Sequence, residues 1–410
     1  MHFRRDCCVG LSLCVLIIGR ASVLCAQLST PLTLQAVVNQ VLATHPLSTA
    51  AAARVQAALG LVRQAGAYAN PEFAFAHNEF SRERTAGLRQ VFEWPLKRQY
   101  RIGAALADEK ITEGEQEAIR QDLIAAAREA FFRVLVALDN VRVADSFAAT
   151  TAQLQLVTNK RWQAGDIPEF EVTKARVETL KAEKDQEVAR GKLATAQSGL
   201  NLLLGRSEAE PVLLEGSLQK VPFLPLLAEL SIAAEVQNPL LLAQRQTVAR
   251  ERMNVDLARA SRIPDLAIDL TRGEDLKAGV VGPLVGLSFA LPLWDRREGA
   301  IVAAVGKLSE AEALLRASQL QVRQALLIAY RNWETAQRQA EVFTRGLLTQ
   351  AEEAAALAER SYQEGEGDLL GVLDAQRSLL AVRREYGQSL FEQHMAWVAV
   401  ERTVGIATGD

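Results

Sequence analysis

Residues that could carry out chemistry are few and scattered along this chain. Apart from His2, the histidines are His45, His77 and His394, which are far apart in the sequence, whereas a metal site needs several ligands at one point. After the first residue the only methionines are Met253 and Met395, too few for a relay of soft metal ions. We therefore expect no metal site and no bound cofactor.

Carboxylates and glycines form no catalytic pattern either. We interpret the pair Glu352 and Glu353, and the pair Asp265 and Asp269, as solvated surface charges and not as acid-base pairs. The segment Gly365-Glu366-Gly367 has the glycines of a phosphate-binding loop but neither its lysine nor its preceding strand. The sequence predicts that the protein is not an enzyme.

The start of the chain has the pattern of a targeting signal. Basic residues precede an apolar stretch from Cys7 to Gly19, which is too short to span a membrane, and we predict a signal peptide over 1–26. A lipid anchor on Cys25 would need a small residue before it, and Leu24 disfavours this modification. The remaining chain has no thiol for disulfides, metal binding or nucleophilic catalysis, because the cysteines are Cys7, Cys8, Cys14 and Cys25.

Composition is typical of an ordered protein without affinity for polyanions. The 410 residues are 49% hydrophobic and 23% charged, which excludes disorder and collagen. With 46 basic and 49 acidic residues the net charge is -3, so nucleic acid is not an expected partner.

An internal duplication of about 200 residues divides the chain. The prolines of the first half recur 193 residues later, where Pro46 and Pro71 match Pro239 and Pro264. Glycines recur after 200 residues, where Gly165 and Gly205 match Gly365 and Gly405. We predict a first structural repeat over 27–210, a linker or equatorial segment over 211–235, and a second repeat over 236–410.

Each repeat is expected to contain helix, then a β-hairpin. Alanine-rich sequence favours helix over 46–69 and 239–263, and the following prolines end these helices. The pattern then changes to a period of two, so we predict β-hairpins at about 72–94 and 265–292. Apolar residues share one face of the second hairpin: Leu266, Ile268, Leu270, Val285, Leu287, Phe289 and Leu291.

Very long helices follow each hairpin. Residues 96 to about 164 and 301 to about 362 contain no proline, so we expect coiled-coil-like packing in antiparallel helical hairpins. We predict that these helices turn back midway, near 143–148 and 343–349. The charged residues closest to these turns are Arg142, Asp145, Glu341 and Arg345.

The alternating hairpins allow two architectures. Strands of about ten residues can cross an outer membrane with the apolar face toward lipid, and Phe92, Trp94 and Trp294 would then form an aromatic girdle at the interface. Because four strands cannot close a barrel, several chains would have to share one. In the other architecture the hairpins pack one face on a soluble helical body.

The order of these features resembles the TolC-like outer membrane factor family, also called outer membrane efflux proteins. The resemblance covers about 34–405 and is carried by Leu291-Pro292-Leu293-Trp294-Asp295, Tyr362-Gln363-Glu364-Gly365 and Val372-Leu373-Asp374-Ala375-Gln376-Arg377, together with the duplication. It implies a mainly α fold with a small membrane β part. Three chains would form a homotrimer with a twelve-stranded barrel in outer-membrane lipid and a helical tunnel in the periplasm.

The same resemblance implies a function and partners. The trimer would be a passive exit duct of a tripartite efflux system of the resistance-nodulation-division type, with an inner-membrane efflux pump and a periplasmic adaptor (membrane fusion) protein. Opening would occur where the helices turn, so we expect some of the four residues Arg142, Asp145, Glu341 and Arg345 to line the aperture. The alternative function is a periplasmic coiled-coil adaptor or structural protein without a pore.

Two segments after the hairpins are similar to the heavy-metal cation branch of this family. They are Pro95-Leu96-Lys97-Arg98-Gln99-Tyr100-Arg101-Ile102 and Trp294-Asp295-Arg296-Arg297-Glu298-Gly299. In that branch a glycine commonly precedes the Lys-Arg pair, and Leu96 stands there in this chain. Metal cations are therefore one candidate cargo, beside drugs and other substrates.

Overall fold

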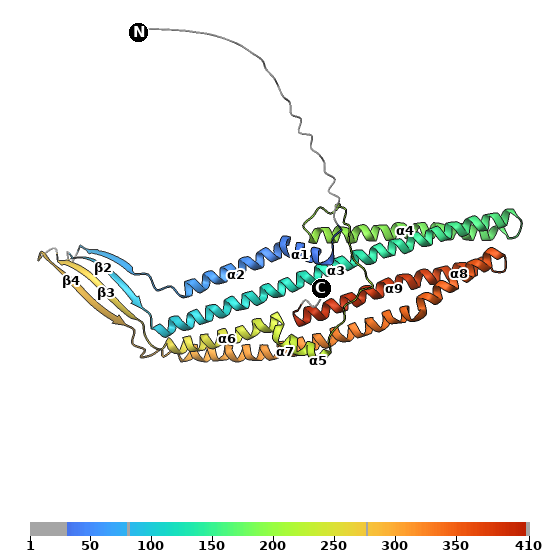
Figure 1. Cartoon of the computed structure of the whole chain (residues 1–410). Coiled ribbons are helices and arrows are strands. Elements are labelled where there is room, and N and C mark those ends of the chain that lie inside the picture. Colours follow the sequence, from blue (N-terminus) through green and yellow to red (C-terminus); the bar gives the residue numbers. More distant parts are fainter. Residues whose placement is uncertain (1–30, 80–82, 276–277, 407–410) are drawn as a thin grey trace, which may run out of the picture.

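The protein is an elongated helical body with a small β-sheet at one end (Figure 1). The computed structural model describes residues 31–79, 83–275 and 278–406. The predicted signal peptide and all four cysteines lie outside the described residues. The predicted mainly helical fold is confirmed.

The elements occur in the same order in both repeats, with a short helix, a second helix, two strands and long helices. The first repeat consists of α1 (Leu34–Thr44), α2 (Pro46–Ala65), β1 (Glu72–Asn78), β2 (Glu83–Phe92), α3 (Pro95–Gln163) and α4 (Glu169–Leu203). The second consists of α5 (Leu227–Gln237), α6 (Pro239–Ala260), β3 (Leu266–Asp275), β4 (Val280–Phe289), α7 (Glu298–Val342), the π-helical turn η1 (Phe343–Leu347), α8 (Leu348–Glu364) and α9 (Leu369–Val404).

The long helix α3 runs along almost the whole body, and other helices pack on it (Figure 1). Its 69 residues correspond to about 100 Å. Near the sheet, α2 and α6 pack on α3, and α7 packs on α6. At the other end α4 packs on α3, while α9 lies between α3 and α8. None of the described helices combines the length and the apolar character needed to cross a bilayer.

The four strands form one antiparallel sheet in the order β1-β2-β3-β4. The central pair joins the two repeats, with Leu88 opposite Leu270. The strand β3 ends at Asp275 and β4 begins at Val280, so both strands are ten residues long. Strand pairing continues through polar residues such as Arg272, because the register depends on the backbone more than on the polarity of the side chain.

In each repeat, the end of the last helix is hydrogen-bonded to the junction between the first two helices, and we call this contact the corner. The helix α4 ends at Gly205 (φ +69°), and the Thr44 hydroxyl donates to the Leu204 carbonyl at 3.3 Å. The helix α9 ends at Gly405 (φ +84°), and the Asn238 amide donates to the Thr403 carbonyl at 2.8 Å. The duplication seen in the sequence is therefore also a duplication of tertiary contacts.

The core lies at mid-body, where helices of both repeats meet. One cluster joins α1, α3 and α4 around Phe131, and another joins α5, α7 and α9 around Trp333 and Trp397. A buried ion pair between Arg128 of α3 and Glu401 of α9 links the repeats, and the Arg128 guanidinium lies 4.6 Å from the centre of the Trp397 ring. Removing one partner would leave a buried charge uncompensated, so the pair fixes how α3 and α9 pack.

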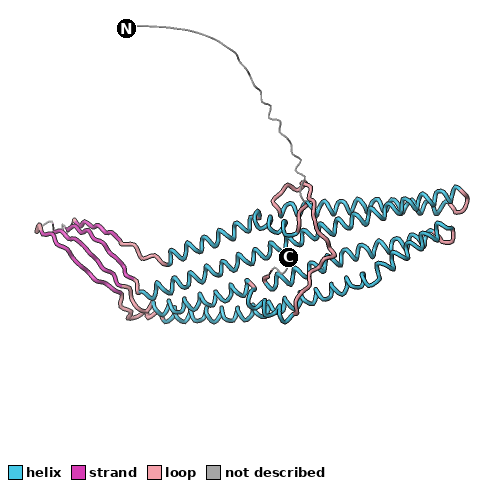
Figure 2. Tube along the Cα trace, in the orientation of Figure 1, coloured by secondary structure: helices cyan, strands magenta, loops and turns pink. Residues whose placement is uncertain are grey.

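The linker between the repeats crosses the helices as an irregular strap over 204–226 (Figure 2). His394 of α9 holds it, because its Nε2 donates to the Leu218 carbonyl at 3.0 Å and its ring stacks on Phe132 with centroids 3.9 Å apart. Burial lowers the pKa of His394, and the bond to the Leu218 carbonyl offsets this only in part. The neutral ring is therefore the form that fits this core.

The predicted mid-helix turns are wrong. The helix α3 continues through 143–148 and ends only at Gln163, where Gly165 (φ +85°) and Pro168 form the stop signal of glycine followed by proline. In the second repeat, 343–349 contains a π-helical turn around Gly346 (φ +152°), and the chain continues in the same direction to Gly365. The turns thus lie at 164–168 and 365–368, at the end far from the sheet.

The two terminal glycines provide a matched test of the corner. A methyl group on Gly405 would lie 2.8 Å from the Gln237 carbonyl oxygen, whereas one on Gly205 would lie 3.8 Å from Thr44. We expect Gly205→Ala to cost about 1–2 kcal/mol, the penalty of a left-handed residue, and Gly405→Ala to cost more through the added clash. Thermal unfolding followed by circular dichroism measures both, and equal losses would contradict the proposed close contact.

Candidate functional site

The histidines and methionines do not come together in space. His45 caps the start of α2, His77 lies in β1 and His394 is buried in α9. Met253 contacts Gly103, and Met395 packs at the mid-body core. Across 31–79, 83–275 and 278–406, no three or more histidine, cysteine or acidic side chains are placed to hold a metal ion.

One face of the sheet is apolar and open to its surroundings. Leu266, Ile268 and Leu270 lie opposite Phe289, Leu287 and Val285, so the register places six of the seven predicted residues on one face. Leu291 lies two residues beyond the end of β4. The first repeat extends this face, which the sequence analysis did not include, with Phe73, Phe75, Leu88 and Phe92. We call these residues the apolar sheet face, and most of their side chains are exposed.

The opposite face of the sheet is mostly polar or small, and Val91 and Leu284 are larger apolar residues on it. Asp269 lies 3.7 Å from Arg89 and accepts a hydrogen bond from Ser288 at 3.4 Å. Gly87 leaves room for Thr271, because a methyl group there would lie 2.6 Å from the Thr271 hydroxyl. The two faces thus differ in chemistry as the faces of a membrane-crossing sheet do.

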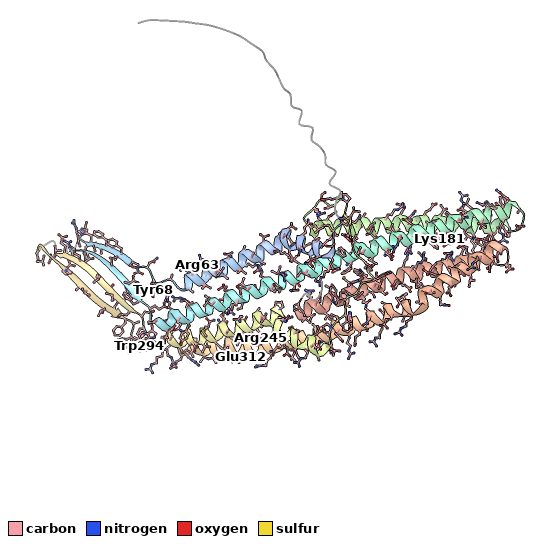
Figure 3. The ribbon with its side chains drawn as sticks, in the orientation of Figure 1. Arg63, Tyr68, Lys181, Arg245, Trp294 and Glu312 are labelled. Carbon is pink, nitrogen blue, oxygen red and sulfur yellow. The ribbon has the colours of Figure 1, made fainter. Side chains whose placement is uncertain are left out.

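Aromatic residues gather where the sheet joins the helices. Phe92 ends β2, Trp94 precedes α3, and Trp294 lies between β4 and α7. Trp294 is 94% exposed and Trp94 43% exposed. Figure 3 shows Trp294 at the end of the helices next to the sheet, on the same level as Tyr68.

The two far turns have the same local structure. Gly165 and Gly365 both adopt φ +85°, and the next residue donates its N–H back to the helix, Asp166 to Arg161 and Glu366 to Ser361, both at 2.9 Å. A left-handed glycine followed by a backbone hydrogen bond of this kind is the Schellman motif, which ends many helices. The two glycines that mark the duplication in the sequence are therefore also the signals that end these helices.

The four charges predicted at the turns lie inside helices, about 20 residues or roughly 30 Å before them. Arg142 pairs with Asp139 of its own helix, and Asp145 accepts a hydrogen bond from Gln186 of α4 at 2.6 Å. Glu341 and Arg345 pair with each other at 2.7 Å. These residues therefore do not meet at the end of the body.

A different set of contacts joins the α3/α4 hairpin to the α8/α9 hairpin, and we call it the latch. Arg377 of α9 makes two hydrogen bonds to the Glu178 carboxylate of α4, one of them at 2.9 Å, and these bonds hold the pKa of Glu178 below its usual value of 4.5. Nearer the turns, Arg161 of α3 donates to the Tyr362 carbonyl at 2.9 Å, and Thr158 lies 3.1 Å from the Tyr362 hydroxyl. Glu178 and Tyr362 are buried, so the latch is part of the packed structure.

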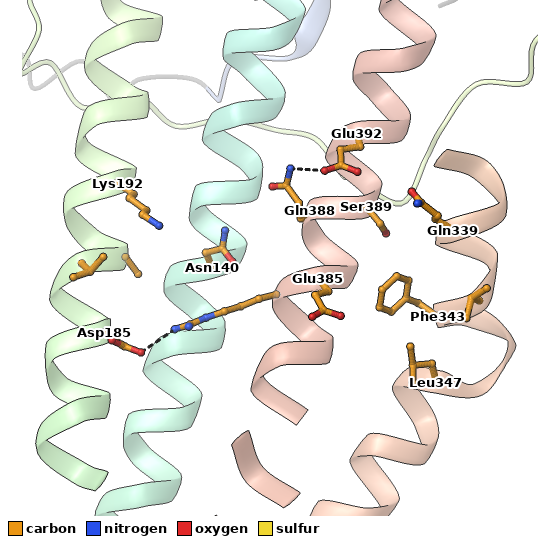
Figure 4. Close-up of a pocket in the computed structure, with 14 residues that line it drawn as sticks. Asn140, Asp185, Lys192, Gln339, Phe343, Leu347, Glu385, Gln388, Ser389 and Glu392 are labelled. Carbon is orange, nitrogen blue, oxygen red and sulfur yellow. Dashed lines mark hydrogen bonds and ion pairs between the residues drawn. The ribbon is translucent and has the colours of Figure 1, made fainter. Parts of the chain in front are cut away.

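A cavity of about 710 Å³ lies between the same hairpins at the level of the π-helical turn (Figure 4). Phe343 and Leu347 form an apolar wall on one side, and Lys192 of α4 lies on the other. Arg384 of α9 spans the gap to Asp185 of α4 at 3.7 Å. Open space therefore separates α4 from α7 and η1, and side chains of α9 bridge it.

Solved structures share this fold. CusC superposes with a TM-score of 0.79 at 18% identity, over 91% of this chain and 92% of CusC. VceC of Vibrio cholerae superposes with a TM-score of 0.75 at 19% identity, over 92% of this chain and 97% of VceC. CusC is described as forming a transmembrane channel and VceC as an outer membrane protein, and this chain shares the fold of both.

The chain belongs to the outer membrane efflux protein family, whose model matches residues 37–206 and 230–405. Members of this family are passive channels and not enzymes. The cobalt-zinc-cadmium resistance protein CzcC of Cupriavidus metallidurans is 28% identical over 379 residues, which are 92% of this chain and 90% of CzcC. The nickel-cobalt-cadmium resistance protein NccC of Alcaligenes xylosoxydans is 23% identical over 78% of this chain and 73% of NccC.

Proposed function

We propose that three copies of the chain form an outer-membrane exit duct for metal cations, as one part of a tripartite efflux system of the resistance-nodulation-division type. The duplicated hairpins would supply four strands per chain to a twelve-stranded barrel, and the long helices would form a tunnel in the periplasm. An inner-membrane pump would drive transport, and a periplasmic adaptor would connect the pump to the duct. Similarity to CzcC along nearly the whole chain supports the metal cargo.

The apolar sheet face is the observation that carries the membrane assignment. Strands of ten residues reach about 34 Å, enough for a tilted strand to cross the apolar layer of an outer membrane. Within the described residues, β1 and β4 have no partner on their outer edges. Unpaired edges cannot remain in lipid, so β4 of one copy would pair with β1 of the next.

The helices next to the sheet support the same arrangement. The helix α2 packs on α3 and α7 packs on α6, so α2 and α7 are the two edges of this layer. Both edges carry exposed apolar residues, among them Leu61 on α2 and Val302 and Leu320 on α7. In a closed ring, these edges would meet between copies and bury their apolar side chains. A pore-free adaptor would leave both the sheet face and these edges uncovered.

The duct would open at the end far from the sheet, where the helices turn. We place the control of opening in the latch, because it joins the two helical hairpins of one chain close to the turns. The earlier candidates Arg142, Asp145, Glu341 and Arg345 bond within one helix or one hairpin and do not link the two hairpins.

Adjacent residues on the two faces of β4 test the membrane assignment. We expect Leu287→Lys to prevent insertion, because a lysine on the lipid face of a barrel costs about 2–4 kcal/mol near the bilayer centre. Ser288→Lys should insert normally, since that side chain faces Asp269 on the polar side. Outer-membrane fractionation and heat-modifiable trimers on gels measure the result. Equal insertion of both variants would contradict a lipid-facing apolar sheet face.

Loss of the latch should open the duct. We expect Arg377→Ala to raise single-channel conductance in planar bilayers, because a partly buried pair of this kind contributes about 1–2 kcal/mol. The lowered pKa of Glu178 means that the latch is complete above about pH 4.5 and weakens as the pH falls below it. Wild-type conductance should therefore rise in acid, and that of Arg377→Ala should not. The control Arg345→Ala removes a pair within one helical segment, and a rise in this control alone would favour the earlier aperture residues.

Growth in the presence of metal salts tests whether metal cations are the cargo of the duct. A strain that lacks this chain but retains its pump and adaptor should lose tolerance to cobalt, zinc and cadmium, by on the order of tenfold in inhibitory concentration if no other duct replaces it. Wild-type chain should restore tolerance, and the Leu287→Lys variant should not. Unchanged metal tolerance with increased sensitivity to organic drugs would overturn the metal assignment and leave the duct itself standing.

A further inference from the structure

The junction of the sheet and the helices carries exposed basic side chains near exposed aromatic rings, among them Trp294 of the predicted girdle. Tyr68 is 75% exposed and Trp294 is 94% exposed. Figure 3 shows both at the end of the helices next to the sheet. Tyrosine and tryptophan favour the boundary between lipid and water, where the ring is apolar and one atom hydrogen-bonds. We define the junction belt as Tyr68, Arg98, Arg262, Trp294, Arg296 and Arg297.

One arginine of the belt is held in a fixed orientation. The Arg98 Nε donates to the Gly66 carbonyl at 2.8 Å, and its guanidinium lies 4.6 Å from the centre of the Tyr68 ring. Its two terminal nitrogens donate to no described residue. A guanidinium fork that is already oriented and has free donors suits a phosphate oxygen, because little side-chain freedom is lost on binding.

The charge at the junction is unbalanced in favour of the arginines. Lys97 already neutralises Asp265 at 2.7 Å, and Arg101 neutralises Glu93 at 2.5 Å. Arg262 and Arg296 are exposed and form no ion pair with a described residue. The belt is thus basic in a chain whose net charge is -3.

Arg297 adds a weaker contribution to this charge. Its nearest carboxylate oxygen belongs to Asp295 and lies 3.9 Å from its Nε, a loose contact between two exposed side chains. Such a pair contributes little in water and leaves most of the guanidinium free for another anion.

We propose that the junction belt binds the phosphate groups of anionic phospholipids, with Tyr68 and Trp294 inserted between the headgroups. This inference rests on the proposed function, which puts the apolar sheet face in lipid and therefore the belt at the level of the headgroups nearest the helical body. The occupant is a lipid and not a soluble anion, because the free arginines lie beside exposed aromatic rings. Such a belt would fix the height of the duct in the membrane, since each arginine near an anionic surface adds attraction.

The test compares two variants with the same change in charge. The belt variant Arg98→Gln/Arg262→Gln/Arg296→Gln removes three arginines at the junction. The control variant Arg54→Gln/Arg316→Gln/Arg360→Gln removes three exposed arginines of the helical body that form no ion pair with a described residue. Purified trimers in a zwitterionic detergent are titrated with phosphatidylglycerol or with phosphatidylcholine. Thermal unfolding and native mass spectrometry then measure stabilisation and retained lipid.

Wild type and the control variant should be stabilised by phosphatidylglycerol and not by phosphatidylcholine. The belt variant should need on the order of tenfold more phosphatidylglycerol for the same shift. Inorganic phosphate at the same concentration should stabilise none of them, and equal stabilisation by phosphate would show a soluble-anion site instead.

Three other results would overturn the inference. Equal responses of belt and control variants would show that only total charge matters. A belt variant that dissociates into monomers without added lipid would show that the belt is a contact between copies. Normal outer-membrane insertion without a preference for anionic lipid would refute the belt alone, whereas failure of the wild type to insert would refute the proposed function as well.

Discussion

The unmet hydrogen-bonding capacity of a four-stranded sheet is the constraint on which the rest of this structure depends. The outer edges of β1 and β4 carry backbone groups that no other described strand satisfies, and in lipid these groups would have no water to bond instead. In the proposed barrel, neighbouring copies of the chain would supply the missing strand partners. The helices α2 and α7 would also need a neighbour, because they continue the two edges of the sheet and carry exposed apolar side chains.

The packed core at mid-body separates the sheet at one end of the chain from the helical turns at the other end. The corners at Gly205 and Gly405, the buried pair of Arg128 and Glu401, and the strap held by His394 all lie between the sheet and the far turns. They join elements that are distant in sequence, so the core fixes α3 against α9 whatever happens at the turns. Motion at the far end need not disturb the sheet, since the contacts there belong to a separate small cluster around Tyr362.

The sequence allowed the repeating parts of the fold to be predicted and not the contacts between repeats. Proline spacing revealed the duplication, and alternation placed Leu266, Ile268 and Leu270 on one face, because both signals are local and periodic. The turn positions failed because length alone was used to divide the helices, while Gly165 and Pro168 carried the stop signal. The ion pair of Glu178 and Arg377 could not be predicted from the sequence. The two residues are 199 positions apart, and their contact depends on which faces of α4 and α9 pack together.

The two repeats differ at one point, and that difference bears on how a duplicated chain could open. Gly346 interrupts the second repeat with a π-helical turn, whereas Ser146, its counterpart 200 residues earlier, lies within the unbroken α3. The non-helical backbone of Gly346 kinks the chain there and interrupts the regular ladder of α-helical hydrogen bonds, so α8 can change direction at lower cost than α3 can. The cavity beside Phe343 leaves space for such a change. In the proposed duct, the latch would connect a hinged hairpin to a rigid one, and this asymmetry would let a few contacts control one end of a long body.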